Sequence, residues 1–439
     1  MNKLKLTNVL ILGSGGREHA IAWKLKQSKL LNKLYVAPGN SGTNTIAENL
    51  NVDINNYSQI KQVIIEKDIE LLVIGPEDPL VNGLHDQLAN DSHIPELLII
   101  GPKSDGAQLE GSKSFAKKFM SKYNIPTANF KSFDAENYQD AIKHIQKSEP
   151  PFVIKVDGLA AGKGVFIVNT VEEGATIIED IMIHSKFGVA GEKIVIETFL
   201  EGVELSVFIL TDGVNYKLLP TAKDYKRVGE NDTGLNTGGM GAVSPVPFVD
   251  EKLMNKIKSR IIEPTLHGLG QEGIKYTGFI FFGLINVNEE PFVIEYNVRL
   301  GDPETQVVMP KIQSDLLDVF MSMKQGKSFT KTNIDINNSV ATTIILTSGG
   351  YPENYKKGYP VKGMNNVHDS ILFHAGLKFE ENKYLTNGGR VLAITSLANS
   401  IKNAREKSYK TLEKISLPVV SVPMKCSRLG GAKAFNGLT

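Results

Sequence analysis

Residues 154–165 read IKVDGLAAGKGV and place two lysines beside a glycine-rich turn. Lys155 stands in an apolar run where a strand would ordinarily carry an aliphatic side chain, and Lys163 lies between Gly162 and Gly164. A single lysine in such a run is most simply explained as a solvated side chain on an edge strand. Two cations beside a turn whose backbone amides can approach an anion instead suit a triphosphate. This stretch therefore predicts a hairpin that covers the phosphates of a nucleotide and opens for its exchange.

A second group of chemically useful side chains lies in FVIEYNVRLGDPE, residues 292–304. On a strand, Glu295, Asn297 and Arg299 share one face, because side chains alternate along the backbone. A carboxylate and an amide oxygen suit Mg²⁺, which takes one or two protein oxygens and completes its octahedron with phosphate and water. A structural ion pair between Glu295 and Arg299 is the alternative, but it gives Asn297 no role. We expect a metal site at Glu295 and Asn297.

A glycine-rich turn, LILGSGGREHA, lies between a predicted strand and a predicted helix near the N-terminus. Free amides of Gly15, Gly16 and Arg17 at the start of a helix suit a single phosphate, and the simpler alternative is a tight turn that needs glycine. A dinucleotide site fits less well, because Glu18 stands where the third glycine belongs and no acidic residue ends the next strand. An NAD-dependent dehydrogenase is therefore the alternative function.

The stretch KIVIETFLEGVELSV lies between the two lysines and the predicted metal pair. An apolar strand that leads into Glu197, Phe199 and Leu200 is able to offer backbone groups to an adenine edge, and Glu204 is able to accept from ribose hydroxyls. The alternative is an ordinary strand, loop and strand.

The first hundred residues alternate short apolar runs that end in Gly or Pro with segments of helical periodicity. This pattern predicts βαβ units on a parallel sheet, whose ligands usually bind at the carboxyl ends of the strands. The apolar runs are residues 8–13, 33–39, 70–76 and 97–102.

After residue 102 the sequence predicts mixed α+β structure, so the fold class is multidomain, α/β and α+β. A glycine-rich loop as long as 223–245 inside a compact domain is more often functional than not. The other predicted elements are a charged helix over 109–123, strands over 151–156, 164–168 and 193–200, a hairpin of 277–285 with 292–298, and further strands and a helix after 330.

The composition is that of a globular protein with more than one domain. The chain has 439 residues, 41% apolar and 22% charged, and its 49 basic residues nearly cancel its 48 acidic ones. We therefore expect neither nucleic-acid nor membrane binding. One cysteine cannot form an intrachain disulfide, and the N-terminal apolar run is too short for an export signal, so we expect a cytoplasmic enzyme.

Seven motifs follow one another along the chain: GSGGREHA, APGNSGT, GPEDPLV, LEGSKSFAKKFM, IKVDGLAAGKGV, DTGLNTGGMGAVSP and RLGDPETQ. Taken in this order, they resemble the phosphoribosylamine–glycine ligase family, also called glycinamide ribonucleotide synthetases, of the ATP-grasp superfamily. The likeness runs from about residue 8 to about residue 415, and the ordered set is far more specific than the glycine turn alone.

The resemblance implies an ATP-grasp fold with an N-terminal Rossmann-like domain, a small lid and a C-terminal α+β lobe. The boundaries that we expect are 1–102 for the N-terminal substrate domain, 103–124 with 193–330 for the ATP-grasp core, 125–192 for the lid, 331–428 for the C-terminal lobe and 429–439 for a tail.

The resemblance also implies the chemistry. ATP phosphorylates the carboxylate of glycine, and the amine of 5-phosphoribosylamine attacks the acyl phosphate to give glycinamide ribonucleotide, ADP and phosphate. Such catalysis needs ATP with Mg²⁺ or Mn²⁺ and no protein nucleophile, and it acts by positioning and charge stabilisation. We expect a monomer or a weak homo-oligomer.

Matching positions in this sequence receive roles from the resemblance. ATP would be held by Lys113, Lys155, Gly162, Lys163, Gly164, Glu197, Phe199, Leu200 and Glu204. The metal would be bound by Glu295 and Asn297. The phosphoribosyl group would be approached by Gly15, Gly16 and Arg17. Glycine and the acyl phosphate would be enclosed by Asp232, Thr237, Gly238, Gly239, Met240, Gly241, Arg299 and Asp302, with Arg299 stabilising the phosphoryl charge.

Three departures from the family pattern limit this transfer. The strand before Glu295 reads GFIFFGLI and lacks the second acidic metal ligand of many ATP-grasp proteins, and Tyr225 stands where relatives often have histidine. The segment 417–439 lacks the usual C-terminal run and receives no role. A non-catalytic ATP-binding protein with this fold is a third functional alternative.

Overall fold

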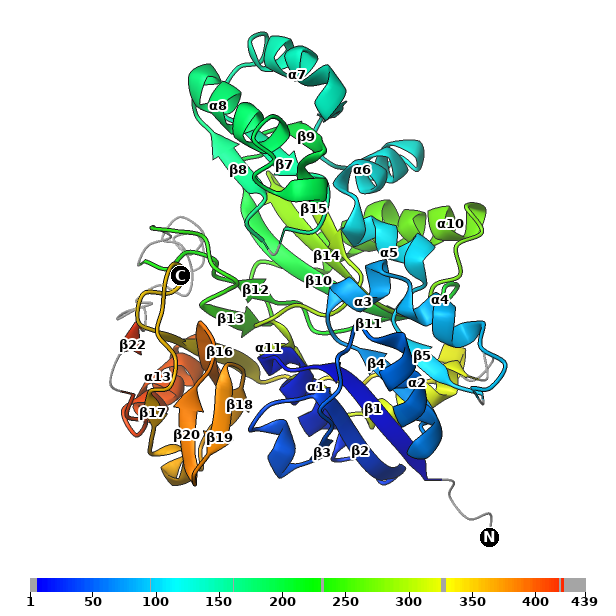
Figure 1. The fold of residues 1–439 in the computed structure, drawn as a ribbon, viewed down its shortest axis with the longest axis vertical. Coiled ribbons are helices and arrows are strands. Elements are labelled where there is room, and N and C mark those ends of the chain that lie inside the picture. The colour runs from blue at the N-terminus through cyan, green and yellow to red at the C-terminus, as the bar shows by residue number, and fades with distance from the viewer. Residues whose placement is uncertain are drawn as a thin grey trace.

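The computed structural model describes residues 6–94, 96–160, 162–229, 233–324, 329–417 and 420–421 (Figure 1). The N-terminal strands are β1 (Thr7–Gly13), β2 (Leu31–Pro38), β3 (Glu48–Asn49), β4 (Leu71–Ile74) and β5 (Leu98–Ile100). They form one parallel sheet in the order β3-β2-β1-β4-β5, which confirms the predicted βαβ pattern. Because β1 is central and buried on both faces, its sequence is a continuous apolar run.

Helices connect these strands and lead into the centre of the molecule. They are α1 (Gly16–Leu25), α2 (Tyr57–Glu66), α3 (Glu77–Val81), α4 (Leu84–Ala89), α5 (Ser104–Gly111) and α6 (Lys113–Lys122). The prediction of a single charged helix over 109–123 is wrong, because the helix is interrupted at Ser112. The Ser112 side chain accepts a hydrogen bond from the Phe115 amide at 3.1 Å and so caps a new helix.

The central sheet is antiparallel and contains the predicted hairpin. Its strands, in the order β11-β10-β14-β15, are β11 (Tyr216–Leu218), β10 (Val203–Thr211), β14 (Gly278–Val287) and β15 (Glu290–Asn297). Apolar side chains of α9 (Glu251–Ile257) and α10 (Glu263–Gln271) pack on one face of this sheet.

A separate antiparallel sheet lies at the top of Figure 1. Its strands, in the order β6-β9-β7-β8, are β6 (Phe130–Asp134), β9 (Lys193–Thr198), β7 (Phe152–Val156) and β8 (Val165–Val168). The helices α7 (Tyr138–Ile145) and α8 (Val171–Met182) cover it, and their apolar residues share one cluster with its strands. This unit, here called the lid sheet, therefore has a hydrophobic core of its own.

The C-terminal lobe takes two strands from the segment predicted to be a loop. Its main sheet follows the order β12-β13-β16-β21-β18, with β22 beside β16. The prediction of a continuous loop over 223–245 is wrong at both ends, because β13 pairs with β16 about a hundred residues later. The strands are β12 (Lys223–Asp224), β13 (Gly241–Ser244), β16 (Val340–Ser348), β18 (Ile371–His374), β21 (Arg390–Ala398) and β22 (Val420–Ser421).

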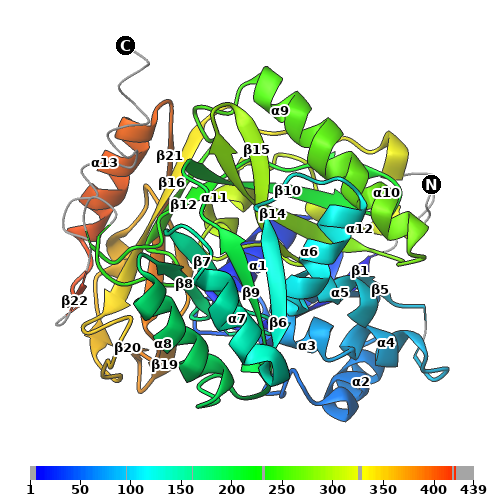
Figure 2. The same cartoon turned by 90° about the horizontal axis from the view of Figure 1, so that it is seen from above.

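A helix and a small second sheet complete the lobe. Figure 2 shows α13 (Ile401–Leu412) along the outside of β16 and β21. The small sheet has the order β17-β20-β19, with β17 (Pro360–Val361), β19 (Leu377–Glu380) and β20 (Lys383–Thr386). Before the lobe, α11 (Thr305–Val308) and α12 (Leu316–Met323) follow the central sheet.

The N-terminal and central sheets share their hydrophobic cores. Leu10 and Leu12 of β1 lie in one apolar cluster with Phe282 of β14, and Val9 of β1 lies in another with Phe281. Alternate residues of each strand thus enter opposite cores, as the two-residue period of a strand requires. Among the described residues, no helix is both long and apolar enough to cross a membrane.

Candidate functional site

Lys155 lies in the interior of the lid sheet, between β9 and β8, and is only 4% exposed. Its ammonium lies 2.9 Å from Glu197 Oε1 and donates a hydrogen bond to the Ile294 carbonyl of β15 at 3.0 Å. The alternative of a solvated lysine on an edge strand is therefore wrong. Lys155 joins the lid sheet to the strand that carries the predicted metal pair.

Glu197 has a second buried cation as a partner, Lys117 of α6. Lys117 Nζ lies 2.7 Å from Glu197 Oε2 and donates to Thr127 Oγ1 at 2.6 Å. Burial lowers the pKa of the Lys117 ammonium to about 8, although the Glu197 carboxylate acts in the opposite direction. Sequence reasoning did not single out Lys117.

The end of β7 is tied to the start of α6 by Asp157. Its carboxylate accepts hydrogen bonds from the Ser114 amide at 2.6 Å and from the Ser112 hydroxyl at 2.9 Å. The predicted ATP ligand Lys113 lies at the same junction, and its ammonium donates to the Gly158 carbonyl at 3.2 Å. Asp157 therefore brings Lys113 and the lid hairpin together.

The tip of the lid hairpin is exposed. Gly162 and Lys163 are exposed, and no contact brings Lys163 to Lys155 among the described residues. Gly164 is buried, and a Cβ atom there would lie 2.9 Å from Val156 Cβ. This glycine is thus required by the close approach of the two strands, a reason different from the predicted contact of its amide with an anion.

The predicted nucleoside residues follow the end of β9. Phe199 is exposed and Leu200 is half-buried. The Glu204 carboxylate, predicted for ribose, instead pairs with Lys226 at 3.0 Å. Coulombic attraction to Lys226 holds the pKa of Glu204 below its ordinary value. Lys226 is a second residue that sequence reasoning missed.

Glu295 and Asn297 lie together near the end of β15, and Asn297 Nδ2 donates to Glu295 Oε1 at 3.5 Å. Burial alone would raise the pKa of the Glu295 carboxyl, but the ammonium groups of Lys226, Lys155 and Lys113 outweigh it and lower that pKa. The carboxylate is therefore ionised at neutral pH, as a metal ligand must be.

The strand opposite offers no acid. Gly283 of β14 pairs with Glu295, and among the described residues no group of three or more His, Cys, Asp or Glu side chains is arranged to hold a metal ion. The donor set is thus one carboxylate and one amide oxygen, which fits Mg²⁺ only when phosphate and water supply the other ligands.

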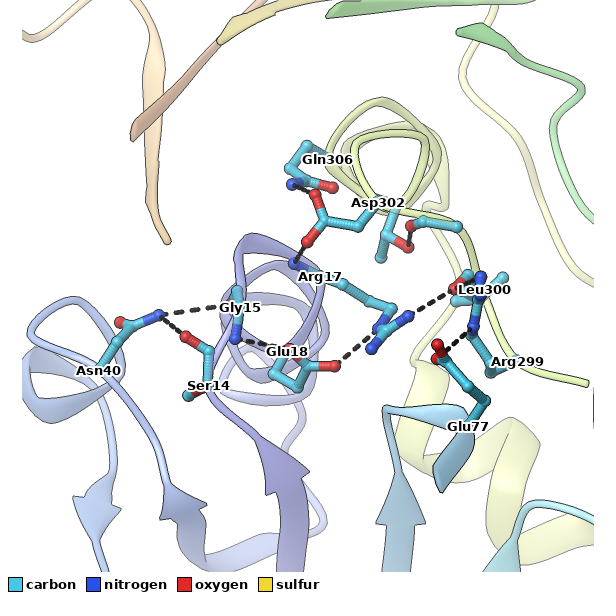
Figure 3. Close-up of polar contacts among 12 residues, drawn as sticks. Ser14, Gly15, Arg17, Glu18, Asn40, Glu77, Arg299, Leu300, Asp302 and Gln306 are labelled. Carbon is cyan, nitrogen blue, oxygen red and sulfur yellow. Dashed lines mark hydrogen bonds and ion pairs between the residues drawn. The ribbon is translucent and has the colours of Figure 1, made fainter. Parts of the chain in front are cut away.

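Arg299 does not pair with Glu295. Its guanidinium donates to Glu77 Oε2 at 3.1 Å and to Glu110 Oε1 at 2.6 Å, and Figure 3 shows it beside Glu77 of α3. The structural Glu295–Arg299 pair that was the alternative to a metal site is therefore absent from the described contacts. Burial raises the pKa of Glu110 to about 7, although Arg299 acts against this shift.

The first glycine turn is already filled by carboxylates of the chain itself (Figure 3). The Gly15 amide donates to Glu18 Oε2 at 2.7 Å, and the Arg17 amide donates to Asp302 Oδ2 at 3.4 Å. The prediction of free amides at Gly15 and Arg17 is therefore wrong. Glu18 also explains why the dinucleotide alternative fails, because its carboxylate lies where a pyrophosphate would need the helix N-terminus.

Asp302 is the meeting point of three parts of the chain. Besides the Arg17 amide, it accepts from Gln306 Nε2 at 2.8 Å and lies 3.4 Å from Arg390 Nη2 of the C-terminal lobe. Burial would raise the pKa of Asp302, but Arg390 and Arg17 outweigh it and lower that pKa. Arg390 is a third residue that sequence reasoning missed.

The glycine-rich segment 237–241 closes over this point. Arg390 Nη1 donates to the Gly238 carbonyl, and a Cβ atom on Gly239 would lie 2.4 Å from Pro303 Cδ. Thr237 Oγ1 accepts from the Gly239 amide at 3.0 Å. Met240 and Gly241 are buried and continue into β13, whereas Asp232 lies outside the described residues. The segment and Asp302 thus come together as predicted, and the described contacts of Arg299 are with Glu77, Glu110 and the Leu300 carbonyl.

Asn40 fixes the first glycine turn from the other side. Its Nδ2 donates to the carbonyls of Ser14 at 2.9 Å and His374 at 2.8 Å, which links the turn to the C-terminal lobe. The sequence motif APGN contained this residue, but its role depends on a contact between distant segments. The same is true of Lys117, Lys226 and Arg390, whose partners only the fold brings near.

Comparison with known proteins matches three successive regions of the chain. Family models described as phosphoribosylglycinamide synthetase match the N domain over residues 7–110, the ATP-grasp (A) domain over 111–305 and the C domain over 341–422. Phosphoribosylamine–glycine ligases of Caldanaerobacter subterraneus subsp. tengcongensis and Haemophilus influenzae are each 42% identical to the chain. These matches cover 93% of this chain and 96% and 95% of the two relatives.

Solved structures agree with these relatives. The crystal structure of phosphoribosylamine–glycine ligase from Thermotoga maritima matches with a TM-score of 0.82 and 33% identity, over 95% of this chain and 99% of that one. The biotin carboxylase domain of a Hydrogenobacter thermophilus carboxylase, solved with MgADP, ADP and bicarbonate, has a TM-score of 0.72 at 14% identity, which shows the fold alone. The chain therefore belongs to the phosphoribosylamine–glycine ligase family and has its ATP-grasp fold.

Proposed function

We propose that this chain ligates glycine to 5-phosphoribosylamine at the expense of ATP, in purine biosynthesis, through a glycyl phosphate intermediate. The observation that carries the proposal is the contact between Lys155 of the lid sheet and the Ile294 carbonyl, next to Glu295. This contact brings the lysine predicted to bind phosphate next to the strand of the predicted metal pair. A nucleotide bound with its metal ion needs both kinds of group close together. The family membership supports the same reaction.

We assign the nucleotide to the space between the lid sheet and β15. Lys155, Lys113 and, from the exposed tip, Lys163 would hold the phosphates, with Gly162 and Gly164 shaping that tip. Phe199 and Leu200 would frame the adenine, with Glu197 beneath them, and Glu204 would accept from the ribose. Glu295 and Asn297 would hold Mg²⁺, or Mn²⁺, which when bound neutralises charge on the phosphates.

The first step forms a bond from a glycine carboxylate oxygen to the γ-phosphorus, and the bond from that phosphorus to ADP breaks. In the second step the amine nitrogen bonds to the glycyl carbonyl carbon, phosphate leaves, and the nitrogen loses a proton. We assign stabilisation of the transferring charge to Arg299, which its two carboxylate partners hold in place. Thr237 to Gly241 and Asp302 would enclose glycine.

We assign the turn of Gly15, Gly16 and Arg17 to the ribose and amine end of phosphoribosylamine. The carboxylates of Glu18 and Asp302 already accept hydrogen bonds from this turn. Carboxylates attract an amine or hydroxyl groups, which supports the assignment of this end of the substrate to the turn. Action in the cytoplasm, as a monomer or weak homo-oligomer, stays a prediction.

The test is the release of ADP in the presence of Mg²⁺. We expect ADP only when glycine and phosphoribosylamine are both supplied, and we expect Glu295→Ala to abolish it. The control is Glu290→Ala on the same strand, whose carboxylate pairs at the surface with Lys256. Unchanged turnover in Glu295→Ala would remove the metal assignment, and ATP binding without turnover would favour the non-catalytic alternative.

A further inference from the structure

Lys117 is among the most deeply buried lysines of the described chain, 2% exposed, and it belongs to none of the roles assigned above. Its two partners are Glu197 and Thr127, at 2.7 and 2.6 Å. A buried ammonium is costly unless it is paired, so its position needs a reason. The partner Glu197 is shared with Lys155, which is the residue predicted to meet the phosphates of ATP.

The sharing is uneven. Glu197 Oε2 accepts a hydrogen bond from Lys117, whereas Oε1 accepts no hydrogen bond from the described residues, although Lys155 Nζ lies 2.9 Å away. Lys155 directs its hydrogen bond to the Ile294 carbonyl instead. The carboxylate is therefore held mainly by Lys117, and Lys155 is attracted to it but not bound by a well-directed hydrogen bond.

The charges of this cluster do not cancel. Lys117 and Lys155 face the single carboxylate of Glu197, which leaves one positive charge in excess. Lys155 also interacts with the Lys113 ammonium and with the Glu295 carboxylate, which are of opposite charge. A buried excess of positive charge favours an anionic ligand, because an anion removes the repulsion between the ammonium groups.

Thr127 extends the contact to the metal strand. Its hydroxyl accepts from Lys117 and donates to the Val293 carbonyl of β15 at 2.7 Å. Lys117 thus connects α6, the carboxylate of β9 and the strand that carries Glu295. Lys117 contacts these protein groups, so we expect its effect on nucleotide binding to be transmitted through them.

We propose that Lys117 is a positioning residue for ATP. Lys117 forms the ion pair with the Glu197 carboxylate, so that Glu197 does not neutralise Lys155 and the Lys155 ammonium stays available to the nucleotide phosphates. This inference rests on the proposed assignment of Lys155 to ATP. Without Lys117, Glu197 and Lys155 form a neutral pair, and the attraction to phosphate weakens while contacts to the nucleoside stay.

The test compares ATP with adenosine, which has no phosphate. Calorimetry with a non-hydrolysable ATP analogue and Mg²⁺ should give a Kd about tenfold higher for Lys117→Gln, with the adenosine Kd unchanged. Lys117→Arg, which keeps the charge, should restore most of the affinity. The control is Lys311→Gln, because Lys311 is equally buried but, among the described residues, donates to the backbone carbonyls of Asn337 and Ser339 and to no side chain. It should lower the thermal midpoint without changing either Kd.

Equal weakening of ATP and adenosine in Lys117→Gln, or no weakening of ATP, would overturn the proposal and leave Lys117 a structural residue. If Lys117→Gln does not fold, pH provides the same comparison with intact protein. Between pH 7 and 9 the wild type should lose ATP affinity relative to Lys117→Arg, since only the lysine loses its proton there. Parallel profiles would contradict the proposal. These are binding measurements, so they stand apart from a failure of the ligase reaction.

Discussion

The Lys155 ammonium is buried and faces one carboxylate and one carbonyl. If it also meets ATP, Lys155→Met should weaken ATP binding by about 1–3 kcal/mol, the range for a lost charge-assisted contact. Calorimetric titration measures this loss. Lys193→Met is the control, since that lysine lies on the neighbouring strand but pairs at the surface with Asp134. Equal affinities for both variants would separate Lys155 from the nucleotide.

Glu304 is a buried carboxyl that accepts a hydrogen bond from the Ser206 hydroxyl at 3.3 Å. Burial and the nearby Asp224 carboxylate raise its pKa to about 8, from an ordinary value near 4.5. A raised carboxyl pKa contributes stability that is full below the unfolded pKa and is lost as pH rises through the folded one. Its contribution therefore declines between about pH 4.5 and pH 8.

Glu304→Gln imitates the protonated form and should remove that decline. We expect the thermal midpoint of this variant to gain on the wild type as pH rises from 5 to 9, with Glu353→Gln on the surface as the control. Thermal unfolding followed by circular dichroism gives the two profiles. A constant difference across this range would show that Glu304 is already ionised.

The placement of Lys155 and Glu295 near each other could be anticipated from the sequence, and the reason is local. Lys155 and Glu295 interrupt apolar strands, so the sequence itself shows a charged residue where a buried apolar one is expected. Arg390 and Lys226 interrupt nothing, and their partners lie 88 and 22 residues away. No periodicity encodes a contact of that kind. Free amides were predicted at Gly15 because the sequence does not show where the Glu18 side chain turns.

Helix α6 depends on Asp157 of another segment for its first turn. Asp157→Ala should lower stability by about 1 kcal/mol, as the loss of a helix cap does, and should raise the KM for ATP because Lys113 lies at that turn. Asp250→Ala is a matched control, since Asp250 caps α9 by accepting from the Leu253 amide at 2.8 Å.

The control should lose similar stability and keep its KM for ATP. Steady-state kinetics and thermal unfolding of both variants make the comparison. Equal changes in KM would mean that the junction has no specific connection with the nucleotide.

Strand positions were predicted well and connections less well. The strands predicted over 8–13, 277–285 and 292–298 match β1, β14 and β15 to within two residues at each end. The helix over 109–123 failed because a serine within a charged segment reads equally well as surface or as cap. The prediction of a loop over 223–245 was wrong because its strands are short and because β16, the partner of β13, lies far along the sequence.

The N-terminal domain and the C-terminal lobe meet at two buried imidazoles. His19 of α1 accepts a hydrogen bond from the His374 amide of β18 at 2.8 Å, and the rings lie 5.5 Å apart. Burial, with His374 as a further cause, lowers the pKa of His19 to about 3, and burial lowers that of His374 to about 4. Both imidazoles are therefore neutral in the folded protein at pH 7.

A lowered imidazole pKa contributes stability that is full above the unfolded pKa near 6.5 and is lost as pH falls through the folded one. Between pH 6.5 and pH 5, each imidazole should lower the free energy of unfolding by roughly 2 kcal/mol, because it takes up a proton only in the unfolded chain. His374→Gln should therefore reduce the fall in thermal midpoint between pH 7 and pH 5, whereas His93→Gln on the surface should not. Identical falls in wild type and His374→Gln would contradict this assignment.

The pairing of β13 with β16 has a consequence for any attempt to isolate a minimal enzyme. Severing the chain after residue 330 would strip β13 of its neighbour and leave the Gly238 amide without the Tyr351 hydroxyl, 2.9 Å away. The truncated product would expose a bare strand border, which invites self-association. A stand-alone ATP-binding module should therefore not be obtainable from this chain by truncation, because the last quarter of the chain contacts the segment 237–241 that we propose encloses glycine.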